Sequence, residues 1–280
     1  MQEQSTSQTG APPQISLHHA QDSHIATFLI ATFFLLSPIV LLLFFAARER
    51  RTPYEEYLRA VRETAQPNSL QVSYSLLPID TDQPVRVATW TRRDQISNYQ
   101  GKTAPANKDV WVTVVPHLKS FCQDYVRTHG DDSKQLSLRL KQRLGLPPDS
   151  NYDSFVELTV DPKDLASFFR PCSDPAPATK TCPPVLPLKP NQLEDDLKAS
   201  DPQRKQEVRI RYWFLNNYYA SFASSRQYPW TGLGYTFDWA PKGEGGDFVR
   251  FGESEFVIPA GTPIKFESAT DTVGYCTPKY

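Results

Sequence analysis

The longest uninterrupted apolar segment of the chain runs from residue 25 to residue 47 and contains no charged side chain. About 20 apolar residues are enough for a helix to cross the hydrocarbon core of a bilayer. A cleavable signal peptide would place a basic region before a shorter apolar core, whereas no Lys or Arg precedes Arg48. The pattern therefore predicts one retained transmembrane helix over 25–47, with the lipid bilayer as a partner.

The segments on either side of this apolar run differ in their patterning. Residues 1–24 are rich in Gln, Ser, Thr and His without periodicity, which predicts a disordered polar tail. Residues 48–66 predict a juxtamembrane amphipathic helix, because Thr52 and Glu55 match a capping box and Pro53 suits the first helical position. The predicted apolar face of this helix consists of Tyr54, Tyr57, Leu58 and Val61.

Strand-like patterns occur in several parts of the chain after residue 66. The β-branched, apolar run 110–115 predicts a central buried strand. Residues 155–160 alternate between two faces and predict a second strand of the same sheet. Two other short alternations, 72–77 and 85–90, are compatible with edge strands.

Helical spacing of apolar side chains predicts two helices between these strands. The first covers 117–129, and the second covers 133–144, with Ser133 as its cap and Gly145 as its end. The segment 207–222 fits both periods: its length favours a helix, whereas the alternation in its first half favours a strand.

The C-terminal region predicts a hairpin whose strands contain Phe256 and Ile264, joined by a turn at Gly261. A proline-rich stretch at 171–202 predicts an irregular loop within the domain. Together the elements predict a single soluble α+β domain over 67–280, with a mixed sheet and two or three helices, behind the transmembrane helix.

Composition excludes some classes of function. The chain of 280 residues has a net charge of −1, so no basic bias indicates a nucleic-acid partner. It contains no phosphate-loop, zinc-protease, EF-hand or nucleophile-elbow motif, and we expect neither a cofactor nor a metal.

The four cysteines predict two disulfide bonds. Cys172 and Cys182 bracket a proline-rich loop that a disulfide would close, and Cys122 with Cys276 would tie the chain end to the core. The alternative is four free thiols in a reducing compartment.

Two arguments about membrane orientation conflict. The basic residues after the predicted span, Arg48, Arg50 and Arg51, favour a cytoplasmic domain by the positive-inside rule. Disulfides require an oxidising compartment instead. We predict a single-pass protein of the cell membrane, with an extracytoplasmic domain slightly favoured and a cytoplasmic one as the alternative.

The aromatic-rich segment from Tyr228 to Trp239 is the main candidate for a binding site. As a strand it would place large apolar side chains on one face and small or polar ones on the other. The polar face would either be covered by another element or form a groove. In the second case Trp230, Thr236 and Asp238 would contact a protein or carbohydrate ligand.

Catalytic candidates are His117, at the end of the predicted central strand, together with Glu157 and Asp238. Two carboxylates and a histidine can perform acid–base chemistry without a local motif, provided that they converge. We therefore predict a membrane-anchored, non-enzymatic envelope protein with a binding or structural role. The alternative is a membrane-bound hydrolase or transferase with its site near 228–239.

Overall fold

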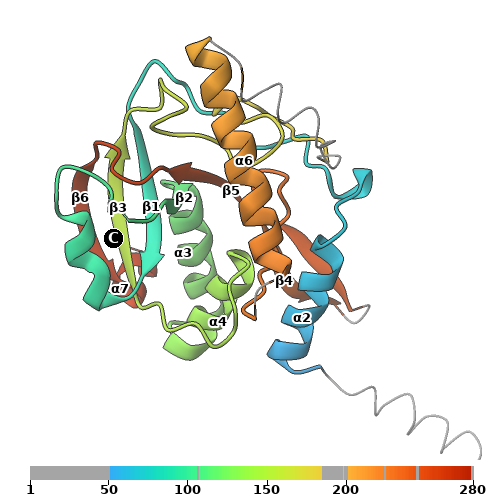
Figure 1. The fold of residues 1–280 in the computed structure, drawn as a ribbon. Coiled ribbons are helices and arrows are strands. Elements are labelled where there is room, and N and C mark those ends of the chain that lie inside the picture. Colours follow the sequence, from blue (N-terminus) through green and yellow to red (C-terminus); the bar gives the residue numbers. More distant parts are fainter. Residues whose placement is uncertain are drawn as a thin grey trace, which may run out of the picture. The chain divides into compact units, whose positions relative to one another are not determined.

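The computed structural model (Figure 1) describes residues 51–184 apart from 106, residue 198, and residues 201–278 apart from 224, 244 and 245. The described residues belong to one compact unit that begins at Arg51. The predicted tail and the predicted span lie outside the described residues. Within the described part of the chain, no helix is both long and apolar enough to cross a membrane.

The domain is built on a six-stranded sheet with the strand order β4-β5-β2-β1-β3-β6. The runs predicted as strands of one sheet are β2 and β3, which confirms that prediction. The predicted mixed sheet is wrong, because every described strand pairing is antiparallel. The strands are β1 (Val85–Thr91), β2 (Val110–Val114), β3 (Ser154–Val160), β4 (Tyr235–Lys242), β5 (Asp247–Ile258) and β6 (Lys265–Asp271).

Two segments considered as edge strands have different structures. Residues 85–90 belong to β1, which lies between β2 and β3 at the centre of the sheet, with Val87 in one core and Trp90 in another. Residues 72–77 form no strand. Burial on both faces explains why the period-2 pattern of β1 did not distinguish a central strand from an edge strand.

Helices cover one face of the sheet, and loops cover the other. The helices are α3 (His117–His129), α4 (Ser133–Arg143), α6 (Pro202–Ala223) and the short α7 (Thr272–Cys276) (Figure 1). On the opposite face the strands pack under loops and the 3₁₀ helix η2 (Arg93–Tyr99). With α2, described below, the α+β class is confirmed, and the helices exceed the predicted two or three.

The ends of α4 follow from local chemistry. Asp132, not the predicted Ser133, is the cap, because its carboxylate accepts hydrogen bonds from the backbone N–H groups of Lys134 and Gln135 at 3.0 and 2.9 Å. Gly145 adopts φ +66° directly after the helix, and Leu146 N–H donates to the Lys141 carbonyl at 2.8 Å. This is a Schellman ending, so the predicted role of Gly145 is confirmed.

The ambiguous segment 207–222 lies within α6, so its helical interpretation is confirmed. Ile210, Trp213 and Phe214 fall at helical spacing and pack on the domain, with Ile210 and Trp213 in a cluster that contains Val257 of β5. Packing against the sheet therefore selects the helical spacing of this segment over the strand alternation.

The predicted juxtamembrane helix forms as α2 (Pro53–Thr64), with the capping box between Thr52 and Glu55 in place. It does not precede the domain as a separate stalk. Tyr57 packs edge-on against Trp239 of β4 at 5.7 Å, and its hydroxyl donates to the carbonyl of Gln227 at 2.6 Å. Tyr54, predicted on the apolar face, is exposed.

The predicted C-terminal hairpin is wrong. Gly261 does form a turn with φ +75°, but the strands on either side of it do not pair with each other. β5 pairs with β2 and β4, whereas β6 crosses to the far edge and pairs with β3. Local alternation specifies a strand and its faces, but it does not identify the neighbouring strand.

The sheet opens between its two central strands. β1 and β2 pair only at Val87–Val114 and Ala88–Thr113. Residues 89–91 of β1 continue to pair with β3, and residues 110–112 of β2 continue to pair with β5, but these two stretches do not pair with each other. We call this gap the β1–β2 seam.

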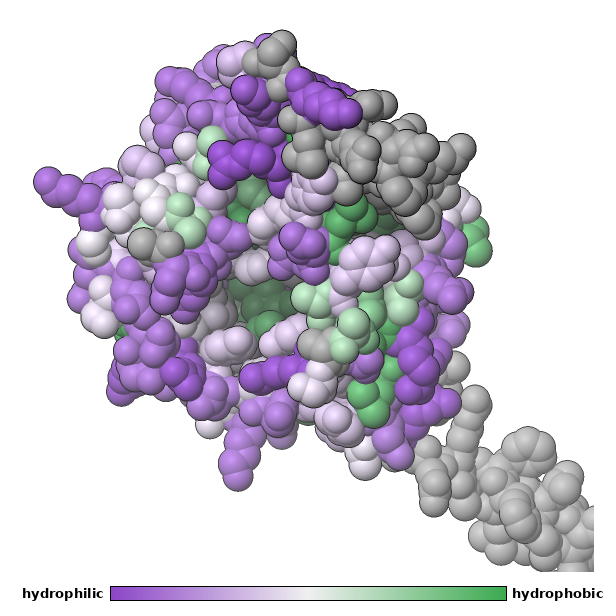
Figure 2. Space-filling model, in the orientation of Figure 1, coloured by the Kyte–Doolittle hydropathy of each residue, from purple (hydrophilic) through white to green (hydrophobic). Residues whose placement is uncertain are grey.

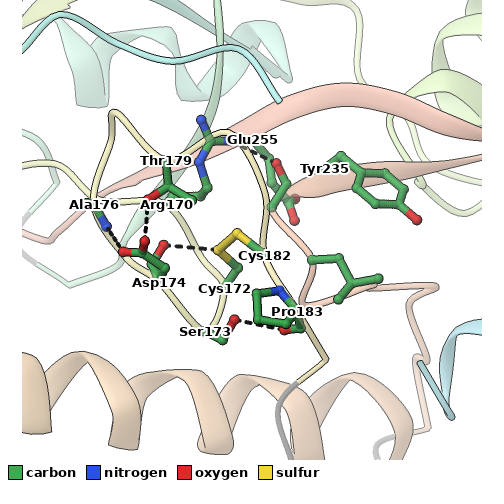
Figure 3. The surroundings of a disulfide bond; sticks show 12 residues. Arg170, Cys172, Ser173, Asp174, Ala176, Thr179, Cys182, Pro183, Tyr235 and Glu255 are labelled. Atoms are coloured by element: carbon green, nitrogen blue, oxygen red, sulfur yellow. Dashed lines mark hydrogen bonds between the residues drawn. A yellow bond between two sulfur atoms is a disulfide. The ribbon is translucent and has the colours of Figure 1, made fainter. Parts of the chain in front are cut away.

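Both predicted disulfides are present. The Cα atoms are 5.1 Å apart in Cys122–Cys276 and 6.0 Å apart in Cys172–Cys182, within the range that a disulfide requires. The second disulfide closes the first part of the proline-rich loop (Figure 3). Residues 185–197, 199 and 200 of that loop lie outside the described residues.

A fully buried arginine fastens this loop to the sheet. Arg170 donates to the carbonyl oxygens of Leu77, Gly234 and Pro177 at 2.6, 3.0 and 3.4 Å, and it lies beside the Cys172–Cys182 disulfide (Figure 3). Burial lowers the pKa of this guanidinium to about 10, so it remains charged at neutral pH. The loop is therefore irregular but anchored.

Candidate functional site

The three catalytic candidates do not meet. His117 is exposed at the start of α3. Glu157 lies on β3 and pairs with Arg86 and Lys119. Asp238 lies on β4, and three strands separate β4 from β3 in the sheet. Strands are spaced by about 4.8 Å, so the two carboxylates are much too far apart to act on one substrate.

The segment from Tyr228 to Trp239 does not keep the predicted alternation between an apolar and a polar face. Tyr235, Phe237 and Trp239 are all buried, but a register shift separates Tyr235 from Phe237, and Tyr235 packs in a different cluster from Phe237 and Trp239. Helix α4 packs closely on β4: the Arg139 guanidinium donates to both oxygens of Asp238, at 2.9 and 2.7 Å. At Asp238 the strand is therefore covered by a helix and does not form an open groove.

The other two ligand-binding candidates have different surroundings. The Thr236 hydroxyl donates to the Arg143 carbonyl at 2.7 Å and accepts from the Glu253 N–H at 2.8 Å, so its only donor is already used. Trp230 is almost fully buried, and its indole N–H donates to Glu255 at 3.1 Å. Of the three candidates, Trp230 and Thr236 line the cavity described below.

Replacing Asp238 with alanine should destabilise the domain without a specific effect on binding. The carboxylate is fully buried, and its removal leaves the largely buried Arg139 without its partner. Breaking a buried ion pair from one side costs about 3–5 kcal/mol. Thermal unfolding of the full chain in detergent measures this loss. Asp124→Ala, which breaks the exposed pair with Arg127, should cost less than about 1 kcal/mol. Equal effects of the two variants would contradict the structural role of Asp238.

The domain contains a large cavity at the β1–β2 seam, which we call the central cleft. Its volume is about 660 Å³, within the range of small-molecule sites. Figure 2 shows a hollow with an apolar floor on this face of the molecule, between the sides that carry α3 and α6 in Figure 1. The cleft is lined by β1 and β2 at the seam, by the end of α4, by α6, and by residues 226–230.

Aromatic rings form much of the cleft wall. Trp90, Trp111 and Trp230 all line it, together with Tyr152 and Tyr228. Trp111 is 37% exposed, although it lies on a central strand, and its ring meets Trp230 edge-on at 5.6 Å. A partly exposed tryptophan in the middle of a sheet is explained by the open seam beside it.

Two acidic residues line the central cleft, and Glu255 of β5 is the buried one, whereas Asp109 is half-buried. Glu255 is 4% exposed, and burial raises its pKa to about 8, opposed by the Trp230 hydrogen bond and by the charge of Arg170. The carboxyl group is therefore mostly protonated at neutral pH. Arg170 acts on it only through its field, because no ion pair joins the two among the described residues.

Thr113 stands opposite Glu255 on the neighbouring strand and on the same face of the sheet. Its hydroxyl oxygen is buried, with no hydrogen-bond partner in the described part of the chain. Buried hydroxyls usually have partners, so an unpaired one in a cleft wall indicates a position for a ligand atom or water.

Neither of these residues was predicted as a site residue from the sequence. Phe256 of the segment EFVI was assigned to a strand of the C-terminal hairpin, and the charged residue before it was not considered. Glu255 directly precedes the apolar run 256–258, and a glutamate next to such a run is a usable signal, because its side chain must face either solvent or a polar site. Thr113, in contrast, resembles an ordinary strand residue.

Comparisons with protein-family models, with curated proteins and with solved structures found no match to this chain. We therefore argue function from the residues of the central cleft.

Proposed function

We propose that this chain is a single-pass membrane protein whose folded domain is a non-enzymatic binding module, with a small organic ligand held in the central cleft. The cleft carries the proposal: it is large, mostly apolar and aromatic, and it contains a few polar groups, the usual composition of a ligand site. The scattered positions of His117, Glu157 and Asp238 give the hydrolase or transferase alternative no support.

We also propose that the domain faces an oxidising compartment. Two disulfides support this orientation against the arginines that follow the predicted span. The uncharged run 25–47 supports the membrane anchor.

Blocking the cleft should abolish ligand binding without unfolding the domain. Ala220 lines the cleft from an exposed position on α6, so Ala220→Phe should obstruct it. The probe is 2-phenylethanol, added to the full chain in detergent while tryptophan fluorescence is followed, since three of the five tryptophans line the cleft. We expect saturable quenching that Ala220→Phe weakens at least tenfold. Ala223→Phe, at an exposed position outside the cleft lining, should bind normally. Unchanged binding by Ala220→Phe would overturn the proposed site.

A further inference from the structure

One buried acidic group lacks the ion-pair partner that the other buried acidic groups have. Among the described residues five acidic side chains are buried, and four of them form ion pairs: Glu56, Glu157, Asp238 and Glu253 each pair with Arg or Lys. Glu255 has no ion pair among the described residues and accepts a hydrogen bond only from the Trp230 indole. A buried carboxyl group without a neighbouring cation stays protonated, and its carboxylate form is stabilised only when a cationic ligand binds.

The surroundings of Glu255 match the needs of an ammonium group. The Thr113 hydroxyl, unpaired and directly across the β2–β5 pairing, is a second acceptor for N–H donors. Trp111 and Trp230 supply aromatic rings in the same wall, and tryptophan is the ring that attracts cations most strongly. Two acceptors and two indole rings thus lie close together in one wall of the cleft.

We infer that the central cleft binds the primary ammonium group of an organic ligand, between the Glu255 carboxylate, the Thr113 hydroxyl and the rings of Trp111 and Trp230. The inference rests on the proposed binding function and names the class of ligand. The apolar remainder of the ligand lies along the β1–β2 seam. A primary ammonium fits better than a quaternary one because both polar partners accept hydrogen bonds.

The other charged or titratable groups near Glu255 do not supply the cation that its carboxylate would need. Arg170 gives its described hydrogen bonds to backbone carbonyls, and Glu253 is already paired with Arg143. Asp109, a half-buried carboxylate that also lines the cleft, accepts hydrogen bonds from the Trp213 indole and from Ala260 N–H. The phenol of Tyr235 donates to the Gln71 carbonyl. Exposed groups are screened by water and salt; those that line the cleft are Lys108 and Arg226, with the half-buried phenol of Tyr228 beside them.

The experiment compares 2-phenylethylammonium with its neutral analogue 2-phenylethanol on the full chain in detergent, by tryptophan fluorescence. We expect the ammonium compound to bind at least tenfold more tightly at pH 8. Equal or weaker binding of the ammonium compound would overturn the inference. If the alcohol still binds saturably and Ala220→Phe blocks this binding, the proposed function stands even when the ammonium preference is absent. Failure of the inference can therefore be distinguished from failure of the proposed function.

The dependence of binding on pH has a definite sign. Without ligand Glu255 is protonated below about pH 8, and the ammonium requires the carboxylate, so binding must release a proton. Alkyl ammonium groups keep their charge up to about pH 10. Affinity should therefore rise about tenfold or more between pH 6 and pH 8. A ligand that accepts a hydrogen bond from protonated Glu255 would show the opposite trend and contradict the inference.

Two substitutions test the named partners. Glu255→Gln resembles the neutral carboxyl group of the free protein, so the fold should persist while the preference for ammonium and the pH dependence are lost. Thr113→Val should weaken binding of the ammonium compound about five- to tenfold, and Thr113→Ser should retain wild-type affinity. The control Glu267→Gln on β6 should leave the affinity for both compounds unchanged. Retained pH-dependent ammonium binding in Glu255→Gln would refute the assignment.

A third probe distinguishes the source of the ammonium group. Nα-acetyl-lysine methylamide presents the same group as a protein side chain does. Tighter binding of this probe than of 2-phenylethylammonium would assign the cleft to a lysine of a polypeptide. The reverse order would assign it to a free amine.

Discussion

Val114→Asp should unfold the domain. Val114 lies on the central strand β2, is 9% exposed, and packs in the core on the loop-covered face of the sheet. It pairs with Val87 where β1 and β2 are still joined, so the new carboxylate would enter an apolar layer without a cation. We expect a loss above about 4 kcal/mol, which is exceptional for one substitution.

The matched control makes the same substitution at an exposed strand position. Val249 of β5 is 38% exposed, so Val249→Asp should change the free energy of unfolding by less than about 1 kcal/mol. Near-ultraviolet circular dichroism of the full chain in detergent, followed during heating, compares the two variants. A cooperative transition of Val114→Asp at the wild-type temperature would contradict the burial of β2.

Removal of the Cys122–Cys276 disulfide should have the second largest effect. The two cysteines are 154 residues apart in sequence, and both are fully buried. A disulfide that closes so long a loop limits the unfolded chain strongly, and the chain-entropy relation gives about 5 kcal/mol. For a domain of this size, that loss lowers the melting temperature by about 10 °C or more.

The second disulfide provides the comparison. Cys172 and Cys182 are only 10 residues apart, for which the same relation gives about 3 kcal/mol. We therefore expect Cys122→Ala/Cys276→Ala to melt below Cys172→Ala/Cys182→Ala. The melting temperatures of both double variants, measured without reductant, test this order. The reverse order would show that anchoring of the proline-rich loop matters more than closure of the long loop.

Local chemistry allowed accurate prediction of several elements. The capping box of α2, the Gly145 ending of α4 and the two buried runs β2 and β3 depend on neighbouring residues, which the sequence displays directly. Both cysteine pairings were also predicted. Errors arose where distant contacts decide: Gly261 makes the expected turn, yet β6 leaves β5 and joins β3 on the other side of the sheet.

The candidate site shows the same limit. Asp238 and Thr236 are polar residues on a strand, but α4 covers them, and the sequence does not show which helix will do so. Trp230 was chosen as a candidate because aromatic residues concentrate around it, and it lines the central cleft. The central cleft could not be predicted, since it depends on where β1 and β2 part, and that separation leaves no local pattern.

The position of α2 has a consequence for the order of folding. This helix follows the predicted anchor directly, yet the Tyr57 hydroxyl bonds to Gln227, 170 residues later in the chain. Tyr218 of α6 likewise donates to the Ala65 carbonyl across 153 residues. Native contacts between such distant segments form slowly, because a long loop must close first. Helix α2 therefore reaches these native partners only after the chain has been synthesised past Gln227. Until then its apolar face lacks the residues that cover it in the folded domain.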